Sequence, residues 1–261
     1  SYVAPPIAVS IIFGALLTKV GLYSIIRTYG LFYYESNFIK SYLLILGAIS
    51  IIAGCIGAIY QKDLKQIVVF NIVISLGVMV CGTATLNTFG VKGALFYAVN
   101  DILLKAALFI IVGLIIYVSG IKYIQKSGLI NKYPLLGWTY FIVVLSLAGV
   151  PPFSGFYGKA LIIKGLVANN NTFIAILVAL SGLVVFYSLI KIFLNVFYDN
   201  INKSLILKPL PKGVQIPLIA IVAIALIIGV SSNLLDGFFD KGIQMVLNPQ
   251  HYIDLVLKKG A

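Results

Sequence analysis

The feature that most limits how this chain can fold is one apolar stretch, residues 133–167, which reads YPLLGWTYFIVVLSLAGVPPFSGFYGKALIIKGLV. An unbroken helix of that length would extend to roughly 50 Å at about 1.5 Å per residue, while the hydrocarbon core of a bilayer is about 30 Å thick. Near its middle lie Gly149, Pro151, Pro152 and Gly155. Because the two prolines remove backbone donors and clash with the preceding turn, we expect the helix to open there.

A lysine, Lys159, follows this break by about two helical turns. Opened backbone at membrane depth persists only where it is buried in protein or lines a watery cavity. A broken helix with a charged side chain beside the break is one way in which transporters build an ion site. The alternative is a simple proline kink with a lysine that extends to the membrane interface. The sequence leaves both interpretations open.

Composition identifies the chain as an integral membrane protein. Hydrophobic residues make up 61% of it and charged residues only 10%, and the mean hydropathy is +1.08. The net charge of +12 does not indicate a nucleic-acid partner, because many of the lysines lie between apolar runs, where they set topology and meet lipid headgroups. Cys55 and Cys81 each lie within an apolar run, so we expect small apolar side chains there rather than a disulfide.

The apolar runs predict an all-α fold with seven membrane spans, because no segment alternates with the period of a barrel strand. Their approximate bounds are 5–29, 39–60, 66–86, 91–118, 133–167, 172–198 and 214–235. Residues 1–235 would form the membrane domain. The mixed apolar and charged residues 236–261 predict a tail along the membrane interface. The chain begins at Ser1 without a methionine, and we expect it to be part of a longer parent.

Loop charges predict the orientation of the spans. The lysines that fall on one side are Lys62, Lys65, Lys122, Lys126, Lys132, Lys203, Lys208 and Lys212. The loops of the opposite side carry Arg27, Lys40, Lys92 and Lys164. By the positive-inside rule the first side is cytoplasmic. The amino end is then expected inside and the tail outside.

Four ionisable residues fall near the middle of predicted spans: Lys19, Asp101, Lys105 and Lys159. Each lysine costs about 2.5–3.5 kcal/mol at a helix centre, so each needs a partner or a wet path. Asp101 and Lys105 are four residues apart, which predicts a direct pair on one helix face. Lys19 and Lys159 have no acidic neighbour within a turn, and the partner of Lys19 could lie outside this sequence. These charges favour a proton relay, but buried pairs that only fix helix packing remain an alternative.

The residues that enzymatic chemistry needs are scarce. With one histidine, two cysteines far apart in the sequence and one acid within the spans, there is no metal site of recognisable spacing. No phosphate-binding glycine loop is present, and no credible serine, histidine and acid set can be assembled. We therefore expect no cofactor and no redox chemistry in this chain, so that any such chemistry would lie in another subunit.

Four segments, in this order, carry a family resemblance: APPIAVSIIFGALLTKVGLYSIIR, GAIYQKDLKQIVVFNIVISLGVM, FYAVNDILLKAALFIIVGL and LSLAGVPPFSGFYGKALII. Together they resemble the carboxyl half of the antiporter-like proton-pumping subunits of respiratory complex I, Mrp-type sodium/proton antiporters and membrane-bound hydrogenases. The first segment is most similar to the D-type chain of Mrp antiporters. The likeness covers about residues 4–230.

The resemblance implies a fold and roles for individual residues. Family members have fourteen core helices that contain two inverted five-helix repeats, and the seven spans here match helices eight to fourteen. Lys19 matches the relay lysine of helix eight, Lys105 that of helix eleven, and Lys159 the lysine or glutamate of broken helix twelve. Tyr97 and Asp101 stand where some members carry histidines. The glutamate–lysine pair of the first repeat is absent from this sequence.

The function implied is that of a proton-translocating, or sodium/proton-translocating, subunit of a multisubunit complex in a prokaryotic cell membrane. Its partners would be the bilayer, other membrane subunits and an amino-terminal half-channel, with no nucleic acid. Iron–sulfur clusters would lie in partner subunits if redox chemistry drives the complex; the sequence leaves open whether redox chemistry or ion gradients do so, and whether sodium is carried. The alternative is a structural membrane subunit of a respiratory or hydrogenase complex that conducts no ions.

Overall fold

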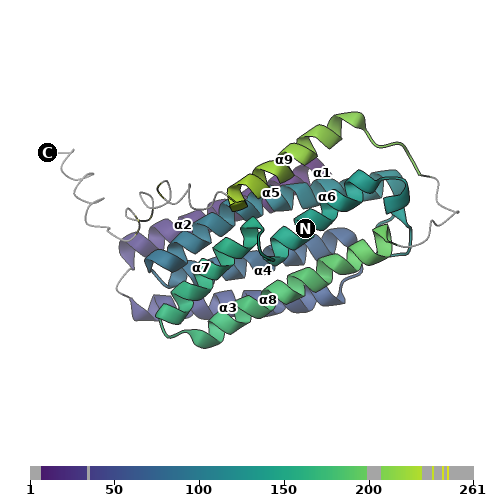
Figure 1. The fold of residues 1–261 in the computed structure, drawn as a ribbon. Helices are drawn as coiled ribbons and strands as arrows, with labels where there is room; N and C mark the ends of the chain where they lie inside the picture. The colour runs from purple at the N-terminus through teal and green to yellow at the C-terminus, as the bar shows by residue number, and fades with distance from the viewer. Residues whose placement is uncertain are drawn as a thin grey trace.

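Long helices that run along a common axis make up most of what the structure, a computed structural model, describes (Figure 1). The described residues are 7–33, 36–198 and 207–230, together with Gly237, Ile243 and Val246. Within these ranges no strand forms apart from a single bridge between Asp63 and Tyr123. The predicted all-α membrane fold is confirmed.

Nearly every predicted span is recovered as a helix with similar bounds. The first combines α1 (Ile7–Ile12), a π-helical turn (Phe13–Leu17) and α2 (Thr18–Phe32). The others are α3 (Asn37–Tyr60), α4 (Leu64–Ala84), α5 (Thr88–Ser119), α6 (Pro134–Ala148), α7 (Ser154–Ala168), α8 (Thr172–Ile192) and α9 (Lys212–Val230). A 3₁₀ turn (Leu129–Asn131) precedes α6, and a π-helical turn (Phe193–Phe197) extends α8. In the described part, five helices are long and apolar enough to cross a membrane alone, and the halves α6 and α7 and the final α9 are shorter.

Side-chain caps and glycines set several helix ends. The Asp63 carboxylate accepts hydrogen bonds from the amides of Lys65 and Gln66 at the start of α4, and the Asn87 side chain accepts one from Gly90 at the start of α5. Such caps satisfy amides that have no partner within the helix. Gly120 ends α5 in the left-handed region, at φ 71°, where a residue without a side chain is favoured.

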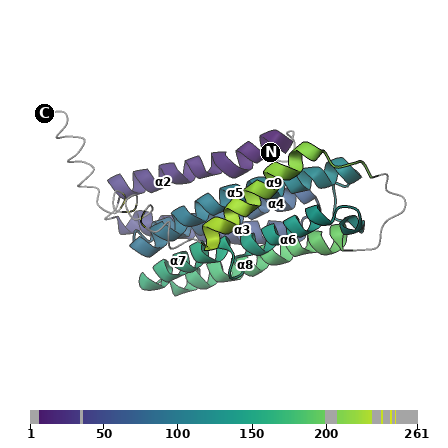
Figure 2. The same ribbon diagram turned by 45° about the horizontal axis from the view of Figure 1, so that its top comes forward.

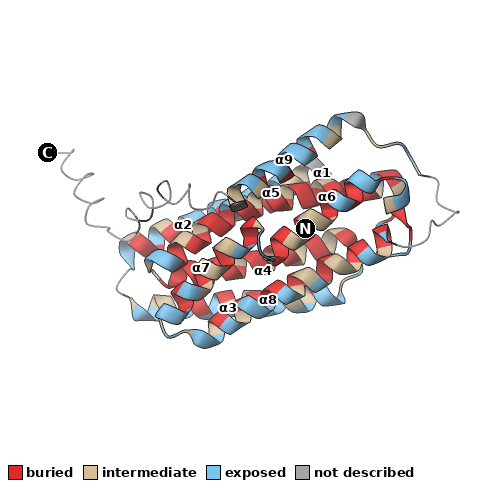
Figure 3. Cartoon of the chain, in the orientation of Figure 1, coloured by how far each residue is buried: buried red, intermediate tan, exposed pale blue. Residues whose placement is uncertain are grey.

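Helices α4 and α5 form the centre of the bundle. In their most apolar windows 72% and 61% of residues are buried, against 28% for α3 and 33% for α8. Figure 3 shows the same division, with exposed residues on the outward faces of α3 and α8. Gly47 of α3 lies so close to Gly77 of α4 that a Cβ atom on Gly77 would come within 2.7 Å of the Gly47 carbonyl oxygen. Small residues at helix contacts are typical of membrane bundles.

Backbone hydrogen bonds tie the loops together at the two ends of the bundle. At one end the Leu64 amide donates to the Lys122 carbonyl (3.0 Å) and the Lys208 amide to the Val118 carbonyl (3.0 Å). These contacts join the loops that the lysine pattern had placed on one side. Which end faces the cytoplasm stays a prediction.

The carboxyl-terminal tail lies almost entirely outside the described residues, as does the predicted boundary at residue 235. The division into a membrane domain and an interfacial tail over 236–261 therefore stays a prediction. Cys55 and Cys81 are both free, which confirms that they do not form a disulfide.

Candidate ion-translocation site

The break in the long apolar stretch lies where the sequence predicted it. Helix α6 ends at Ala148, Gly149 adopts the left-handed conformation (φ 84°), and α7 begins at Ser154. Figures 1 and 2 show α6 and α7 following each other along the bundle. Both halves pack against α5 and α8, so the opened backbone is enclosed by protein, as membrane depth requires.

Lys159 fills the space beside this break. Its ammonium donates hydrogen bonds to the carbonyl oxygens of Leu147 and Ala148, both at 2.9 Å, and lies 5.6 Å from the centroid of the Tyr97 ring. The last carbonyls of a helix lack partners within the helix and carry the negative end of its dipole. Lys159 is only 6% exposed, so the alternative of a lysine that extends to the interface is wrong.

Asp101 forms an ion pair with Lys19. The Lys19 ammonium lies 2.6 Å from Asp101 Oδ2, and the Ser75 hydroxyl donates to the same oxygen at 3.1 Å. The predicted pair between Asp101 and Lys105 is wrong in this structure. A spacing of four residues permits a contact on one helix face, but here the carboxylate turns toward α2, the helix that carries Lys19. The partner of Lys19 thus lies within this chain.

Lys105 is the most enclosed of the three lysines, at 1% exposure. Among the described residues no hydrogen bond or ion pair of its ammonium is found. Ser75 and Asp101 are in contact across the antiparallel hairpin of α4 and α5, which places Asn71, one turn earlier, at the level of Lys105. The Asn71 amide group donates to Ser188 of α8 at 3.1 Å, and its carbonyl oxygen has no partner within the described ranges.

A chain of polar side chains links α5 to both sides of the helix break. The Ser154 hydroxyl donates to Asn100 Oδ1, and the hydroxyls of Ser146 and Ser154 lie 3.1 Å apart. Asn100 immediately precedes Asp101 in the sequence. This link, like the Tyr97 ring over Lys159, was not predicted. The only sequence signal for it was that these polar residues lie in otherwise apolar runs.

The four predicted site residues therefore gather around α5. Helix α5 contacts the first membrane-spanning helix on one side and α7 on the other, so Lys19 approaches Asp101 from one side and Lys159 approaches Tyr97 from the other. Asn71, Ser75 and Asn100 all make hydrogen bonds between helices. In the described part of the chain, no cluster of histidine, cysteine, aspartate and glutamate side chains could hold a metal ion.

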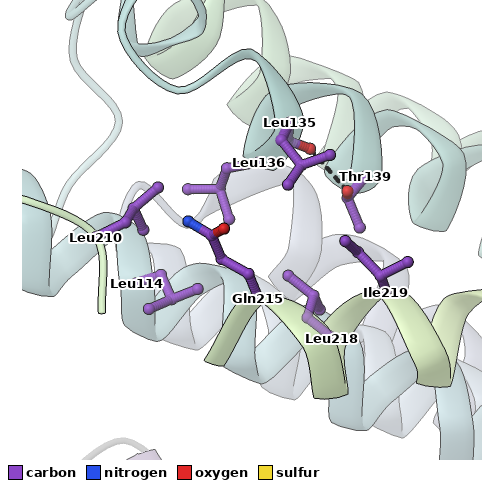
Figure 4. A pocket seen from close by; sticks show the side chains of 8 residues that line it. All are labelled: Leu114, Leu135, Leu136, Thr139, Leu210, Gln215, Leu218 and Ile219. Atoms are coloured by element: carbon purple, nitrogen blue, oxygen red, sulfur yellow. Dashed lines mark hydrogen bonds between the residues drawn. The ribbon is translucent and has the colours of Figure 1, made fainter. Parts of the chain in front are cut away.

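A small cavity between α5, α6 and α9 lies apart from this cluster (Figure 4). Its lining is mostly leucine, and Gln215 of α9 directs its carboxamide toward Leu136. The Thr139 hydroxyl, also in the lining, is bonded to the Leu135 carbonyl at 2.7 Å. Because the lining of this cavity contains no charged side chain, we do not assign it to the ion path.

The comparison with known families agrees with this geometry. The sequence pattern described as NADH:quinone oxidoreductase/Mrp antiporter, transmembrane, matches residues 1–185. The chain belongs to this family. The resemblance inferred from the four ordered segments is thereby confirmed.

Relatives are similar over nearly the whole of this chain but are about twice as long. The chain is 38% identical to the D-type chain of the Na⁺/H⁺ antiporter of Bacillus subtilis, and the match covers 99% of this chain and 53% of that protein. This chain thus spans about half the length of that relative.

Solved structures share the fold. A chain of the Mrp complex from Dietzia sp. aligns with a TM-score of 0.90 at 22% identity, covering 98% of this chain and 56% of that one. A chain of the membrane-bound sulfane sulfur reductase, an archaeal respiratory membrane complex, aligns with a TM-score of 0.81 at 25% identity, covering 87% of this chain and 40% of that one. Both are parts of multisubunit assemblies, which supports other membrane subunits as neighbours of this chain.

Proposed function

We propose that this chain supplies one proton-conducting half of the D-type chain of an Mrp sodium/proton antiporter in a bacterial cell membrane. Protons would pass along Lys19, Asp101, Lys105 and Lys159. The identity of 38% to the D-type chain of a Na⁺/H⁺ antiporter and the likeness to a chain of an Mrp complex both support this function.

The observation that carries the proposal is the burial of three lysines with a single acid among them. Lys19, Lys105 and Lys159 are 7%, 1% and 6% exposed. At about 2.5–3.5 kcal/mol each at a helix centre, three such lysines are expensive to insert. Intramembrane ionisable groups of this kind mark ion pathways far more readily than they mark simple packing.

The rest of the antiporter would come from parts that this sequence does not contain. The relative from Bacillus subtilis is about twice as long, so we propose that an amino-terminal half-channel completes the D-type chain and that further membrane subunits complete the complex. The excess of lysines at one end of the bundle supports an orientation with that end in the cytoplasm.

Replacing Lys159 with alanine tests the proposal. We expect Lys159→Ala, in the purified complex reconstituted into liposomes, to lower sodium-driven proton movement at least about a hundredfold per assembled complex, since a relay fails when one member is removed. The matched control is Lys164→Ala, which removes an exposed lysine of α7 that lies over the Phe89 ring and should leave exchange unchanged.

The second candidate function is a structural membrane subunit whose charges only hold helices together. The two hydrogen bonds from Lys159 to α6 are the observation that favours it. This alternative predicts that Lys159→Ala reduces the amount of assembled complex while each assembled complex transports at the full rate. That outcome would overturn the proposed function.

Absorption spectroscopy separates gradient-driven from redox-driven complexes. We expect the complex purified from its native membrane to show no iron–sulfur absorbance, as an antiporter driven by ion gradients should. Broad visible absorbance from iron–sulfur clusters would instead assign this chain to a redox-driven assembly.

A further inference from the structure

One carboxylate lies within reach of two lysines. Asp101 meets Lys19 of α2 at 2.6 Å, and Lys105 follows Asp101 by one turn on α5. The contact with Lys19 is a close ion pair rather than a well-directed hydrogen bond, and the second carboxylate oxygen, Oδ1, has no partner among the described residues. Asp101 is fully buried, so water is not at hand to stabilise that oxygen.

We propose that Asp101 is a movable counter-ion that pairs alternately with Lys19 and with Lys105. This inference rests on the proposed function and adds a switch to it. The structure shows the state in which the carboxylate pairs with Lys19. In the second state the carboxylate turns along its own helix and Oδ1 or Oδ2 meets the Lys105 ammonium.

The exchange of partners follows from the charges. When a proton leaves the Lys19 ammonium and reaches the Lys105 amine, Lys19 becomes neutral and Lys105 becomes positive. The carboxylate keeps its charge throughout and is then beside a neutral amine, with a cation one turn away. An acid that precedes a base by four residues on a helix has the favourable orientation for a pair, so a rotation of the Asp101 side chain suffices to follow the charge.

The two states exclude each other, because one carboxylate cannot neutralise two separated lysines. Ser75 biases the choice, since its hydroxyl donates to the oxygen that contacts Lys19 (3.1 Å). A two-state element of this kind responds to whatever changes the charge on either lysine. Charge passing between Lys19 and Lys105 is thereby linked to the position of Asp101.

Replacing Lys19 with methionine should trap the second state. We expect a structure of the complete complex with Lys19→Met, determined by electron cryo-microscopy, to show a carboxylate oxygen of Asp101 about 2.7–2.9 Å from the Lys105 ammonium, as in other charge-assisted bonds. Methionine keeps most of the length of the lysine stem and removes only the charge. The matched control is Lys164→Met, in which Asp101 should stay with Lys19.

A transport measurement accompanies the structure. Asp101→Asn should lower sodium-driven proton exchange at least about tenfold per assembled complex, because neither lysine keeps a counter-ion. Asp101→Glu retains a carboxylate that reaches both lysines and should keep most of the exchange. Asp63→Asn, at the cap of α4, should have no effect, since asparagine caps a helix about as well as aspartate.

The outcomes separate this inference from the proposed function. If Asp101 in the Lys19→Met complex remains away from Lys105, or if Asp101→Asn exchanges at the full rate, the movable counter-ion is wrong even when Lys159→Ala abolishes exchange. If Asp101 does move to Lys105 while Lys159→Ala exchanges at the full rate, the exchange of partners stands and the proposed function is wrong.

Discussion

The pair between Lys19 and Asp101 can be examined by a double-mutant cycle for stability. The two charged atoms lie 2.6 Å apart, and the side chains are 6% and 0% exposed. Removing one partner of a buried pair leaves an uncompensated charge and typically costs about 3–5 kcal/mol. We consider Lys19→Met, Asp101→Asn and the double variant, because both replacements are neutral and close in shape to the original side chains.

The two single variants should differ, for a reason visible in the structure. After Lys19→Met, Asp101 keeps the hydrogen bond from Ser75 and has Lys105 one turn away, so the loss should lie at or below about 3 kcal/mol. After Asp101→Asn, Lys19 and Lys105 both remain without an acid, so the loss should approach about 5 kcal/mol. The double variant leaves Lys105 much as it was and replaces the pair with neutral groups, which is often nearly neutral for stability.

Melting temperatures of the purified complex, followed by intrinsic fluorescence, provide the measurement. We expect the double variant to melt closest to the unsubstituted complex, followed by Lys19→Met and then Asp101→Asn. The expected coupling energy is at least about 2 kcal/mol, well above the few tenths of a kcal/mol seen for independent sites. A double variant whose loss equals the sum of the two single losses would refute the pairing, and a less stable Lys19→Met than Asp101→Asn would refute the compensating role of Lys105.

Two further predictions concern the surroundings of the break. Because the Tyr97 ring lies over the Lys159 ammonium (5.6 Å), Tyr97→Phe, which keeps the ring, should retain sodium-driven exchange, whereas Tyr97→Leu should lower it at least about threefold; equal losses in both variants would assign the role to the hydroxyl instead. A Cβ atom on Gly155 would overlap the Ser146 carbonyl oxygen, so Gly155→Ala should destabilise the complex by about 1–3 kcal/mol. Gly21 has nothing within 4 Å of the same position, and Gly21→Ala should leave the melting temperature unchanged or raise it.

The helix break could be predicted because its cause is local. Two consecutive prolines preceded by a glycine prevent a continuous helix whatever surrounds them, and the observed end of α6 at Ala148 and start of α7 at Ser154 follow from that sequence. The spans were predicted for a similar reason, since hydrophobic length is a property of each segment alone. The burial of Lys159 was left open, because it depends on the packing of α5 and α8 around the break.

The partners of the charges could not be predicted from spacing. Asp101 and Lys105 satisfy the rule for a pair on one helix, yet the carboxylate contacts Lys19, 82 positions away in the sequence. Only the packing of the first spanning helix against α5 brings these two side chains together. The link from Asn100 through Ser154 depends in the same way on how the two halves of the broken helix meet α5.

The three lysines end up in three different environments, and this difference bears on how a relay could work. Lys19 is compensated by a carboxylate, and Lys159 by two carbonyl oxygens and an aromatic ring. Carbonyls and a ring cannot take up a proton, so Lys159 can change its charge without any acid following it. Lys105 lies between these extremes, with its nearest acid already paired to Lys19. A charge that arrives at Lys105 must therefore either draw Asp101 away from Lys19 or remain uncompensated at the centre of the bundle. Because the second course is costly in a dry interior, protonation of Lys105 and release of Lys19 should occur together.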